Sequence, residues 1–328
     1  MRSLGPEVAV SLGVSPRQPL EAFARQLGEL EAAGAGRFWI IDSQLAMKDV
    51  YVALALAALH TRSACLGTGV TNPSTRHPTV TATAIATVAE LAPGRVVLGL
   101  GAGDSAVYGI GRRPARLAEV DAALRFFRAV LAGGEGEWEG RPYRLPFEIQ
   151  RIPVYLAVSQ PKMCEMAGRL ADGAIVMGPS DPDFAARQVG WIHEGLETAN
   201  RDRSEIEICL MTTLAEDVED VRSWASTEAR LLADFVELPA ALEPFRDEIR
   251  RAKEGYDFGQ HLSVHAGHQV AVSDELARAL AVAGPPEECA GRLRRLLATG
   301  ADGLIFALPG GGRHERLRFI REQVLARL

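Results

Sequence analysis

Two aspartates stand where a carboxylate could take part in proton transfer. Asp104 closes the run Gly99 to Asp104, and Asp42 follows the apolar run Trp39 to Ile41. A positioned carboxyl group can act as a general acid or base. Glycines at such a position let backbone N–H groups approach a ligand closely, and the start of a following helix favours an anion. The pattern suits a large planar cofactor with a phosphate tail.

The elements that position Asp104 are contained in Leu66 to Ser105. This stretch predicts a strand, a polar loop, a helix and a second strand, which together make one βαβ unit. Two parallel strands joined by a helix deliver their carboxyl ends to the same side of a sheet. We therefore expect Thr68 to Asn72 and Gly101 to Ser105 to face one cleft.

Short runs rich in Val, Ile and Leu alternate with longer helical segments along the whole chain, which is typical of parallel strands covered by helices. Continuous hydrophobicity favours strands that are buried on both faces. Eight strands with eight helices predict a (β/α)8 barrel, a TIM barrel, with an open doubly wound sheet as the competing fold. The predicted strands are Glu7 to Val14, Arg37 to Asp42, Ala64 to Val70, Arg95 to Leu100, Pro153 to Val158, Gly173 to Met177, Glu205 to Thr213 and Gly303 to Leu308.

Two segments depart from the repeat. Gly133 to Phe147 predicts a small ribbon or loop, and Glu216 to Asp274 is too long for one barrel helix and contains several prolines and glycines. We interpret residues 216–274 as a helical insertion between the seventh and eighth strands. No low-complexity linker divides the chain, so residues 1–328 are expected to form a single domain.

Composition narrows the functional class. The chain has 328 residues, is 47% hydrophobic and carries a net charge of -6, without a Lys/Arg cluster interleaved with aromatics, which argues against nucleic-acid binding. The most apolar run, Val50 to Leu59, is too short to span a membrane and predicts a helix pressed between other elements. Four isolated cysteines and the lack of a secretory signal at the amino terminus favour a cytoplasmic protein.

The glycines before Asp104 resemble a dinucleotide-binding fingerprint only in part. Their spacing is G-x-G-x-G instead of G-x-G-x-x-G. The acids about twenty residues further on, Glu119 and Asp121, lie in a predicted amphipathic helix and not at the end of a second strand. The dinucleotide interpretation is therefore not favoured.

Several motifs together carry a family resemblance. They are Trp39-Ile40-Ile41-Asp42, Asp49-Val50-Tyr51-Val52-Ala53-Leu54, Leu66 to Pro73, Thr75-Arg76-His77-Pro78 and Gly99 to Asp104. This set resembles the bacterial luciferase-like superfamily, and within it the methylenetetrahydromethanopterin reductase-like branch that uses coenzyme F420. The resemblance is most specific from Phe38 to Ser105, resumes at Pro153 to Pro179 and is weak over residues 216–274. The fold that this resemblance implies is again a TIM barrel with insertions.

The resemblance also implies a site. In that branch a non-prolyl cis peptide supports the cofactor ring from behind, and by motif position it falls between Gly69 and Val70. Catalytic roles are implied for Asp104 and Asp42. The implied cofactor-binding residues are Asp42, Ser43, Gly69, Val70, Thr71, Asn72, Ala102, Gly103, Asp104, Ala157, Val158, Ser159, Gln160 and Gly178.

One position departs from the family pattern. Relatives commonly have Asp-His after the second strand, whereas Asp42 is followed here by Ser43 and Gln44. A serine hydroxyl cannot act as a base near neutral pH without an activating partner. Any step that relatives perform with that histidine is performed differently here.

The resulting hypothesis is an oxidoreductase that transfers hydride between coenzyme F420 and a small organic substrate, with Asp104 as proton donor or acceptor. An alternative is a monooxygenase that uses reduced FMN at the same site. An alternative of another class is a non-catalytic flavin-binding barrel. A phosphate-binding barrel lyase is less favoured, because Lys162 has no carboxylate set around it. The family resemblance implies a homodimer or higher homo-oligomer.

Each candidate residue also has a purely structural interpretation. Asp104 could merely cap the following helix, Asp42 could hold a loop, and Arg76 and His77 could serve packing or ion pairing. His261, His265 and His268 recur at helical spacing, but no acidic partner set accompanies them, so no metal site is predicted. A solvated or packing role is favoured for them, with lining of the substrate mouth as the alternative.

Overall fold

The protein folds as a closed barrel of eight parallel strands. The computed structural model describes residues 8–235, 238–257, 267 and 272–328. Each strand pairs with the next one of the barrel along the chain, and β12 closes the ring on β1. The barrel strands are β1 (Val8–Leu12), β2 (Ala35–Ile40), β3 (Cys65–Thr68), β4 (Val96–Leu100), β7 (Val154–Val158), β8 (Gly173–Val176), β9 (Glu207–Thr212) and β12 (Gly303–Ala307).

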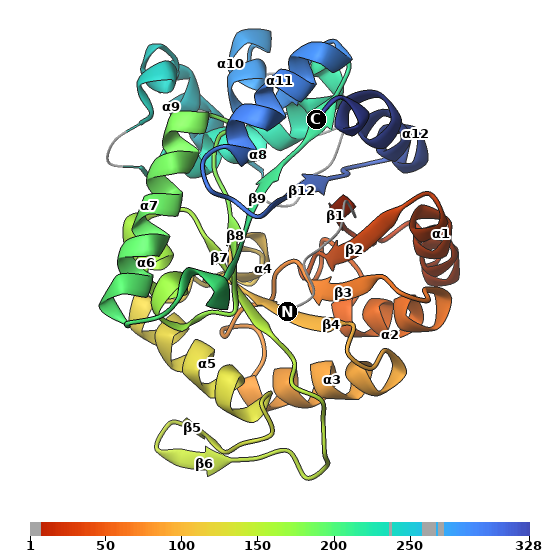
Figure 1. Ribbon diagram of the computed structural model, residues 1–328, viewed down its shortest axis with the longest axis vertical. Helices are drawn as coiled ribbons and strands as arrows, with labels where there is room; N and C mark the ends of the chain where they lie inside the picture. Colours follow the sequence, from red (N-terminus) through yellow and green to blue (C-terminus); the bar gives the residue numbers. More distant parts are fainter. Residues whose placement is uncertain (1–7, 236–237, 258–266, 268–271) are drawn as a thin grey trace.

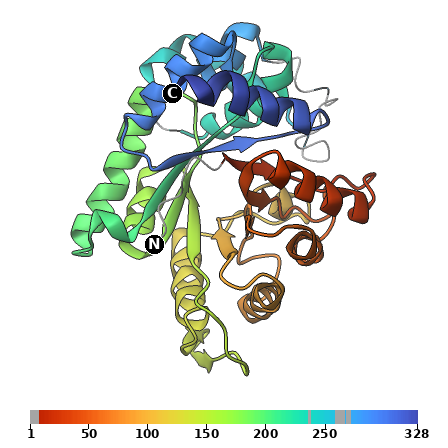
Figure 2. The same cartoon turned by 45° about the vertical axis from the view of Figure 1, so that its right-hand side comes forward.

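Helices cover the outside of this barrel (Figure 1, Figure 2). All eight predicted strands and the predicted barrel are confirmed, and the closed ring excludes an open doubly wound sheet. The helices are α1 (Leu20–Ala32), α2 (Val50–His60), α3 (Pro78–Leu91), α4 (Ser105–Tyr108), α5 (Leu117–Val130), α6 (Pro161–Leu170), α7 (Pro182–Thr198), α8 (Arg222–Leu232), α9 (Arg246–Glu254), α10 (Asp274–Leu280), α11 (Pro286–Leu297) and α12 (Arg313–Arg318).

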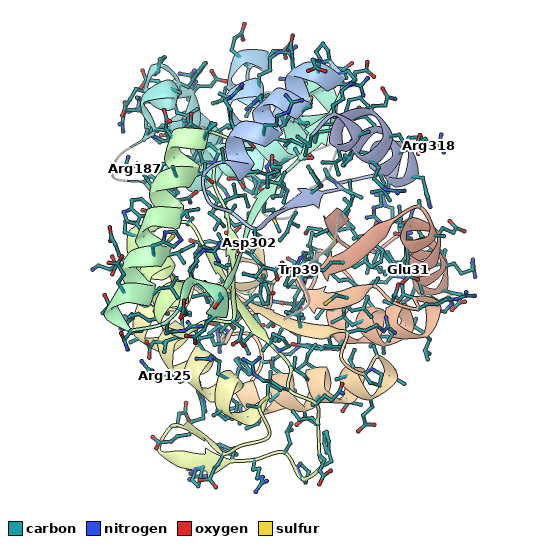
Figure 3. The ribbon with its side chains drawn as sticks, viewed as in Figure 1. Glu31, Trp39, Arg125, Arg187, Asp302 and Arg318 are labelled. Carbon is teal, nitrogen blue, oxygen red and sulfur yellow. The ribbon has the colours of Figure 1, made fainter. Side chains whose placement is uncertain are left out.

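The barrel strands are apolar on both faces because both faces are buried. β1, β2, β4, β8 and β9 are buried along their whole length. One face of each strand meets the helices and the other fills the barrel, where Trp39 is completely buried. Figure 3 shows Trp39 in the middle of the molecule, with Arg125 and Arg187 on its outside. Continuous hydrophobicity was therefore the correct signal for this sheet.

The prediction for Val50 to Leu59 was partly wrong. The segment forms α2, and its inner face is buried as expected, but Val52 is 52% exposed and Leu59 is 65% exposed. A barrel helix is covered by the sheet on one side only, so an apolar residue on the opposite side faces outward. An all-apolar sequence cannot indicate which side is covered.

The two predicted departures from the repeat are both present. Residues 133–147 contain the antiparallel hairpin of β5 (Gly136–Trp138) and β6 (Arg141–Tyr143), which lies beside the end of α5 (Figure 1). Within residues 216–274, the described part of the chain is helical and includes α8 and α9. A short parallel pair, β10 (Leu214–Ala215) with β11 (Val282–Ala283), brings the two flanks of this region together. That residues 216–274 are an insertion within a single domain stays a prediction.

Within the described ranges, no helix is both long enough and apolar enough to cross a membrane.

The amino-terminal end of the barrel contains a buried ion pair. Arg37 Nη1 lies 3.1 Å from Glu207 Oε2, and both side chains are at most 10% exposed. The Tyr155 hydroxyl donates a hydrogen bond to the same carboxylate, and the guanidinium lies 5.5 Å from the centre of the Tyr155 ring. Each charge is therefore compensated inside the barrel by a partner from another strand.

Replacing Arg37 by Met should destabilise the fold by about 3 kcal/mol, because the Glu207 carboxylate would stay buried without its cation. Urea unfolding followed by circular dichroism measures this loss. The matched control is Asp247→Asn, which removes an exposed ion pair with Arg250 and should change the free energy of unfolding by less than about 1 kcal/mol. Equal effects of the two variants would contradict a structural role for the buried pair.

Candidate functional site

A cavity of about 280 Å³ opens at the carboxyl ends of the barrel strands. The segments after β2, β3 and β4, the ends of β7 to β9 and the helix α8 form its walls. It is lined by Ser11, Ile41, Asp42, Gly69, Val70, Asn72, Gly101, Ala102, Gly103, Asp104, Ser105, Ala106, Ala157, Val158, Ser159, Met163, Ile175, Met177, Met211, Trp224, Thr227 and Leu231. Function in this barrel architecture lies at this end of the strands.

Ten of the residues predicted from the sequence line this one cavity. They come from segments that are far apart in the chain and that the barrel brings together. The ten are Asp42, Gly69, Val70, Asn72, Ala102, Gly103, Asp104, Ala157, Val158 and Ser159. Four others, Ser43, Thr71, Gln160 and Gly178, do not line it.

Asp42 is a buried carboxylate with two fixed partners. The Thr71 hydroxyl donates a hydrogen bond to Asp42 Oδ2 at 2.8 Å, and Arg76 Nη1 contacts the same oxygen at 2.6 Å. Arg76 also reaches Asp49, which caps the start of α2. Thr71 therefore orients Asp42 instead of facing the cavity itself.

Ser43 joins two loops behind the cavity. Its hydroxyl lies 2.8 Å from the Ser105 hydroxyl at the start of α4, and the residue is 2% exposed. This contact ties the loop after β2 to the segment that carries Asp104. The Ser43 hydroxyl is therefore engaged with Ser105, and the residue does not line the cavity.

The peptide bond between Gly69 and Val70 is cis, as the resemblance implied. Close packing explains the glycines around it. A Cβ atom at Gly69 would lie 2.8 Å from Trp39 Cβ, and one at Gly101 would lie 2.8 Å from Val70 Cγ2. Larger residues at either position would displace the wall of the cavity.

Asp104 projects into the site and does not cap α4. Its side chain makes no capping hydrogen bond and is 34% exposed. Arg230 Nη2, on α8, contacts Asp104 Oδ2 at 2.5 Å. Burial raises the pKa of Asp104, and the guanidinium of Arg230 opposes this rise.

α8 closes one side of the cavity with Trp224, Thr227 and Leu231. The Thr227 hydroxyl lies 3.1 Å from the Tyr256 hydroxyl, and the Arg230 guanidinium lies 5.0 Å from the Tyr256 ring centre. Glu228, on the same helix, is fully buried, and neither carboxylate oxygen has a hydrogen-bond partner among the described residues. Burial raises the pKa of Glu228 to about 8.

The carboxyl end of β7 leads into the start of α6, and a helix start favours an anion. Ser159 and Gln160 directly precede α6, whose first residue is Pro161, and Gln160 Nε2 is buried without a hydrogen-bond partner in the described chain. Gln188 donates hydrogen bonds to the carbonyl groups of Ser159 and Met177 and so fixes the ends of β7 and β8. Gly178 lines a separate small cavity.

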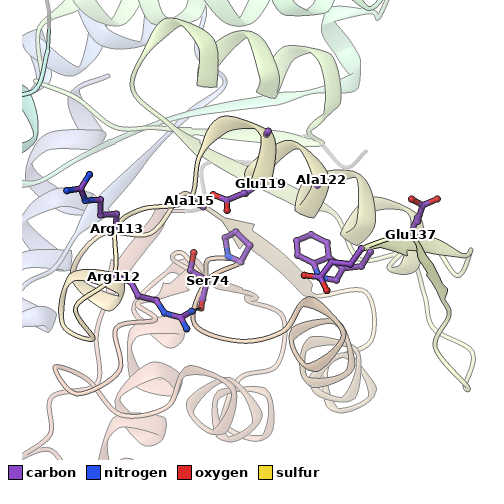
Figure 4. Close-up of a pocket in the computed structure, with 11 residues that line it drawn as sticks. Ser74, Arg112, Arg113, Ala115, Glu119, Ala122 and Glu137 are labelled. Atoms are coloured by element: carbon purple, nitrogen blue, oxygen red, sulfur yellow. Dashed lines mark hydrogen bonds between the residues drawn. The ribbon is translucent and has the colours of Figure 1, made fainter.

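A second, larger cleft of about 730 Å³ lies between the loop after β3, α5 and the β5–β6 hairpin (Figure 4). Its walls carry charges of both signs, among them Arg112, Arg113 and Glu119. Residues predicted to be functional are absent from its lining. The smaller cavity at the strand ends is therefore the candidate active site.

No group of three metal-binding side chains occurs among the described residues. His261, His265 and His268 lie outside the described residues.

The sequence of residues 5–303 matches the family model for luciferase-like monooxygenases. The chain belongs to this family. The predicted family, the barrel fold and the class of oxidoreductases are therefore confirmed.

Several known proteins are similar to this luciferase-like protein. A 5,10-methylenetetrahydromethanopterin reductase from Methanolobus tindarius is 28% identical over 94% of this chain and 97% of its own length. An F420-dependent glucose-6-phosphate dehydrogenase from Rhodococcus jostii is 27% identical over 78% of this chain and 75% of its own length. The structure of the F420-dependent tetrahydromethanopterin reductase from Methanopyrus kandleri superposes with a TM-score of 0.77 at 23% identity, covering 98% and 99% of the two chains.

Sequence reasoning missed the contribution of α8. Arg230 and Asp104 are separated by 126 residues, and no local spacing relates them. The signal is visible only in the structure, where α8 contains charged residues and yet is buried at nearly every position, including Glu228 and Arg230. Such burial of charge indicates partners elsewhere in the fold.

Replacing Glu228 by Gln should stabilise the protein increasingly as the pH rises. The folded protein holds the Glu228 proton up to about pH 8, whereas the unfolded chain loses it near 4.5, so wild-type stability falls between these values. From pH 5 to pH 8 the wild type should lose roughly 3 kcal/mol relative to Glu228→Gln.

Urea unfolding at several pH values measures this difference. The matched control is Glu254→Gln, at the exposed end of α9, which should keep a constant difference from wild type across the range. A constant difference for Glu228→Gln would mean that the buried carboxyl is not held protonated.

Proposed function

We propose that the protein is an oxidoreductase that transfers hydride between coenzyme F420 and a small organic substrate at the carboxyl ends of the barrel strands. The observation that carries the proposal is the cavity that brings together Asp42, Val70 and Asp104. The reductase and dehydrogenase relatives, whose cofactor is F420 where it is named, agree with this reaction and cofactor.

The residues present fit such a cofactor. Val70, Ala157, Ile175 and Met177 offer an apolar wall to a planar ring. Ser159, which lines the cavity shortly before α6 begins, offers a hydrogen-bond donor to an anionic tail at the start of that helix. The lining thus combines an apolar wall with polar groups, which suits a ring with a phosphate tail.

Bound F420 supplies a carbon that accepts or donates hydride. The protein positions the substrate and handles the accompanying proton. Asp104 is the candidate for this task because its carboxylate is partly exposed in the cavity, whereas Asp42 is held by Thr71 and Arg76. Asp42 then serves to orient the ring or the substrate.

Titration with F420 and with FMN tests the cofactor, followed by absorbance and fluorescence. We expect F420 to bind at least about tenfold more tightly than either oxidised or reduced FMN, which corresponds to about 1.4 kcal/mol. Turnover is then assayed with methylenetetrahydromethanopterin plus reduced F420, and with glucose-6-phosphate plus oxidised F420. Tighter binding of reduced FMN would instead favour a monooxygenase, and failure to bind any of these compounds would refute a redox function.

A matched pair of variants tests the location of the site. Ala157→Phe places a ring inside the cavity and should abolish detectable F420 binding, because the lining has no space for both rings. Ala118→Phe makes the same change in the second cleft and should leave F420 binding unchanged. The reverse result would move the site to the second cleft.

We further infer a homodimer formed through the outer faces of α2 and α3. Leu59 and Val80 are 65% and 55% exposed there, and the only charged residue in the two helices besides the terminal His60 is Glu90. Two copies of an uncharged apolar face can meet about a twofold axis without opposing like charges.

The four cysteines are free thiols, which suits the cytoplasm.

Leu59→Glu should convert the dimer into a monomer, since it places a charge on this apolar face. Light scattering coupled to size-exclusion chromatography measures the mass. Leu117→Glu, an exposed leucine on α5, is the control and should leave the dimer intact. A dimer that survives Leu59→Glu would exclude this surface.

A further inference from the structure

The contact between Asp104 and Arg230 joins the barrel to α8. The carboxylate follows β4 and is partly exposed in the cavity, whereas the guanidinium side chain is only 5% exposed. The atoms Arg230 Nη2 and Asp104 Oδ2 are 2.5 Å apart. The cation therefore approaches the carboxylate from the protein side and leaves the cavity side accessible.

Arg230 is itself fixed in position. Its guanidinium lies over the Tyr256 ring, and the Tyr256 hydroxyl contacts Thr227 one turn earlier on α8. The start of α8 is anchored by Arg222, which donates a hydrogen bond to the Val272 carbonyl and pairs with Asp274. A rigid helix thus presents the cation to the loop that carries the acid.

Building on the proposed function, we propose that Arg230 is a positioning residue that holds Asp104 as an ionised carboxylate facing the cavity, and thereby makes Asp104 a proton acceptor. An arginine does not lose its proton in this pH range, and its planar group fixes the orientation of a carboxylate. A carboxylate held in this way is ionised before the reaction and can accept the substrate proton.

Oxidation of an alcohol breaks its C–H and O–H bonds and forms a C=O bond. The substrate C–H bond breaks, its hydrogen leaves with both electrons for the oxidised coenzyme, and the hydroxyl proton passes to an Asp104 oxygen as the C=O bond forms. The carboxylic acid then releases that proton to water. In the reverse direction Asp104 must first be protonated from water.

The charged and titratable groups that interact electrostatically with Asp104 are Arg230 and Glu228 of α8, Asp234 beyond its end and Tyr256. Glu228 is largely protonated at neutral pH because burial raises its pKa to about 8. Asp234 is paired with Lys253. Arg230 is consequently the cation whose removal should most affect the ionisation of Asp104, and its loss would raise the pKa of Asp104 further.

The first experiment needs neither substrate nor cofactor. Aspartate labelled with ¹³C at the carboxyl group is incorporated into the protein, and the Asp104 signal is assigned by its loss in Asp104→Asn. In Arg230→Gln the titration midpoint of this signal should rise by about one pH unit or more. Arg230→Lys keeps the charge without the planar group and should show a smaller shift, and it also serves if Arg230→Gln does not fold.

Arg222→Met is the matched control, because it removes an arginine that anchors the same helix without touching Asp104. It should leave the Asp104 midpoint unchanged. An unchanged midpoint in Arg230→Gln, or equal shifts in Arg230→Gln and Arg222→Met, would overturn the proposal.

Kinetics with whichever of the two substrates is turned over provide the second readout. In the oxidation direction, Arg230→Gln should lower kcat by about tenfold or more because the carboxylate loses its fixed orientation, and the acid limb of its pH profile should move to higher pH. Binding of F420 to Arg230→Gln should stay within about threefold of wild type, which corresponds to less than about 1 kcal/mol. If the wild-type protein does not bind F420, the proposed function is refuted. If Arg230→Gln is active and the acid limb of its pH profile is not shifted, only the role of Arg230 is refuted.

Discussion

The closure of the parallel sheet is the constraint on which the site depends. Because all eight strands run in the same direction around one ring, their carboxyl ends meet at one end of the barrel. This geometry brings the segments after β2, β3 and β4 to one cavity, although Asp42 and Asp104 are far apart in the chain. The buried core, including Trp39 beneath the cavity, keeps these ends in register. The common direction of the strands therefore determines where the candidate site lies.

Much of this arrangement could be predicted from the sequence because it is encoded locally. Strand positions follow from short apolar runs, and the cavity walls follow from the residues that end them. The cis bond between Gly69 and Val70 followed from the resemblance of a contiguous motif. The exposed side of α2 could not be predicted, since Val52 and Leu59 are as apolar as the buried residues beside them. A helix that is apolar at every position does not show in its sequence which side is buried.

The partner of Asp104 could not be predicted for a different reason. Arg230 belongs to the region in which the family resemblance was weak, and its place depends on how α8 packs against the barrel. The same holds for Glu228, which has no charged neighbour at the spacing that stabilises exposed helices. Burial of such residues is visible only once the fold is formed. Long-range electrostatic contacts therefore remained outside what periodicity and motifs indicate.

Ser43, which stands where relatives commonly have a histidine, has a structural role. Ser43 contacts Ser105, the residue after Asp104, and so stabilises the loop that carries the acid. In the described part of the chain, Asp42 and Asp104 are the only titratable side chains that line the cavity. Asp42 is committed to Thr71 and Arg76, whereas Asp104 is exposed on its cavity side. Because these two carboxylates lie in such different surroundings, we propose different roles for them, with Asp104 as the group that exchanges the proton.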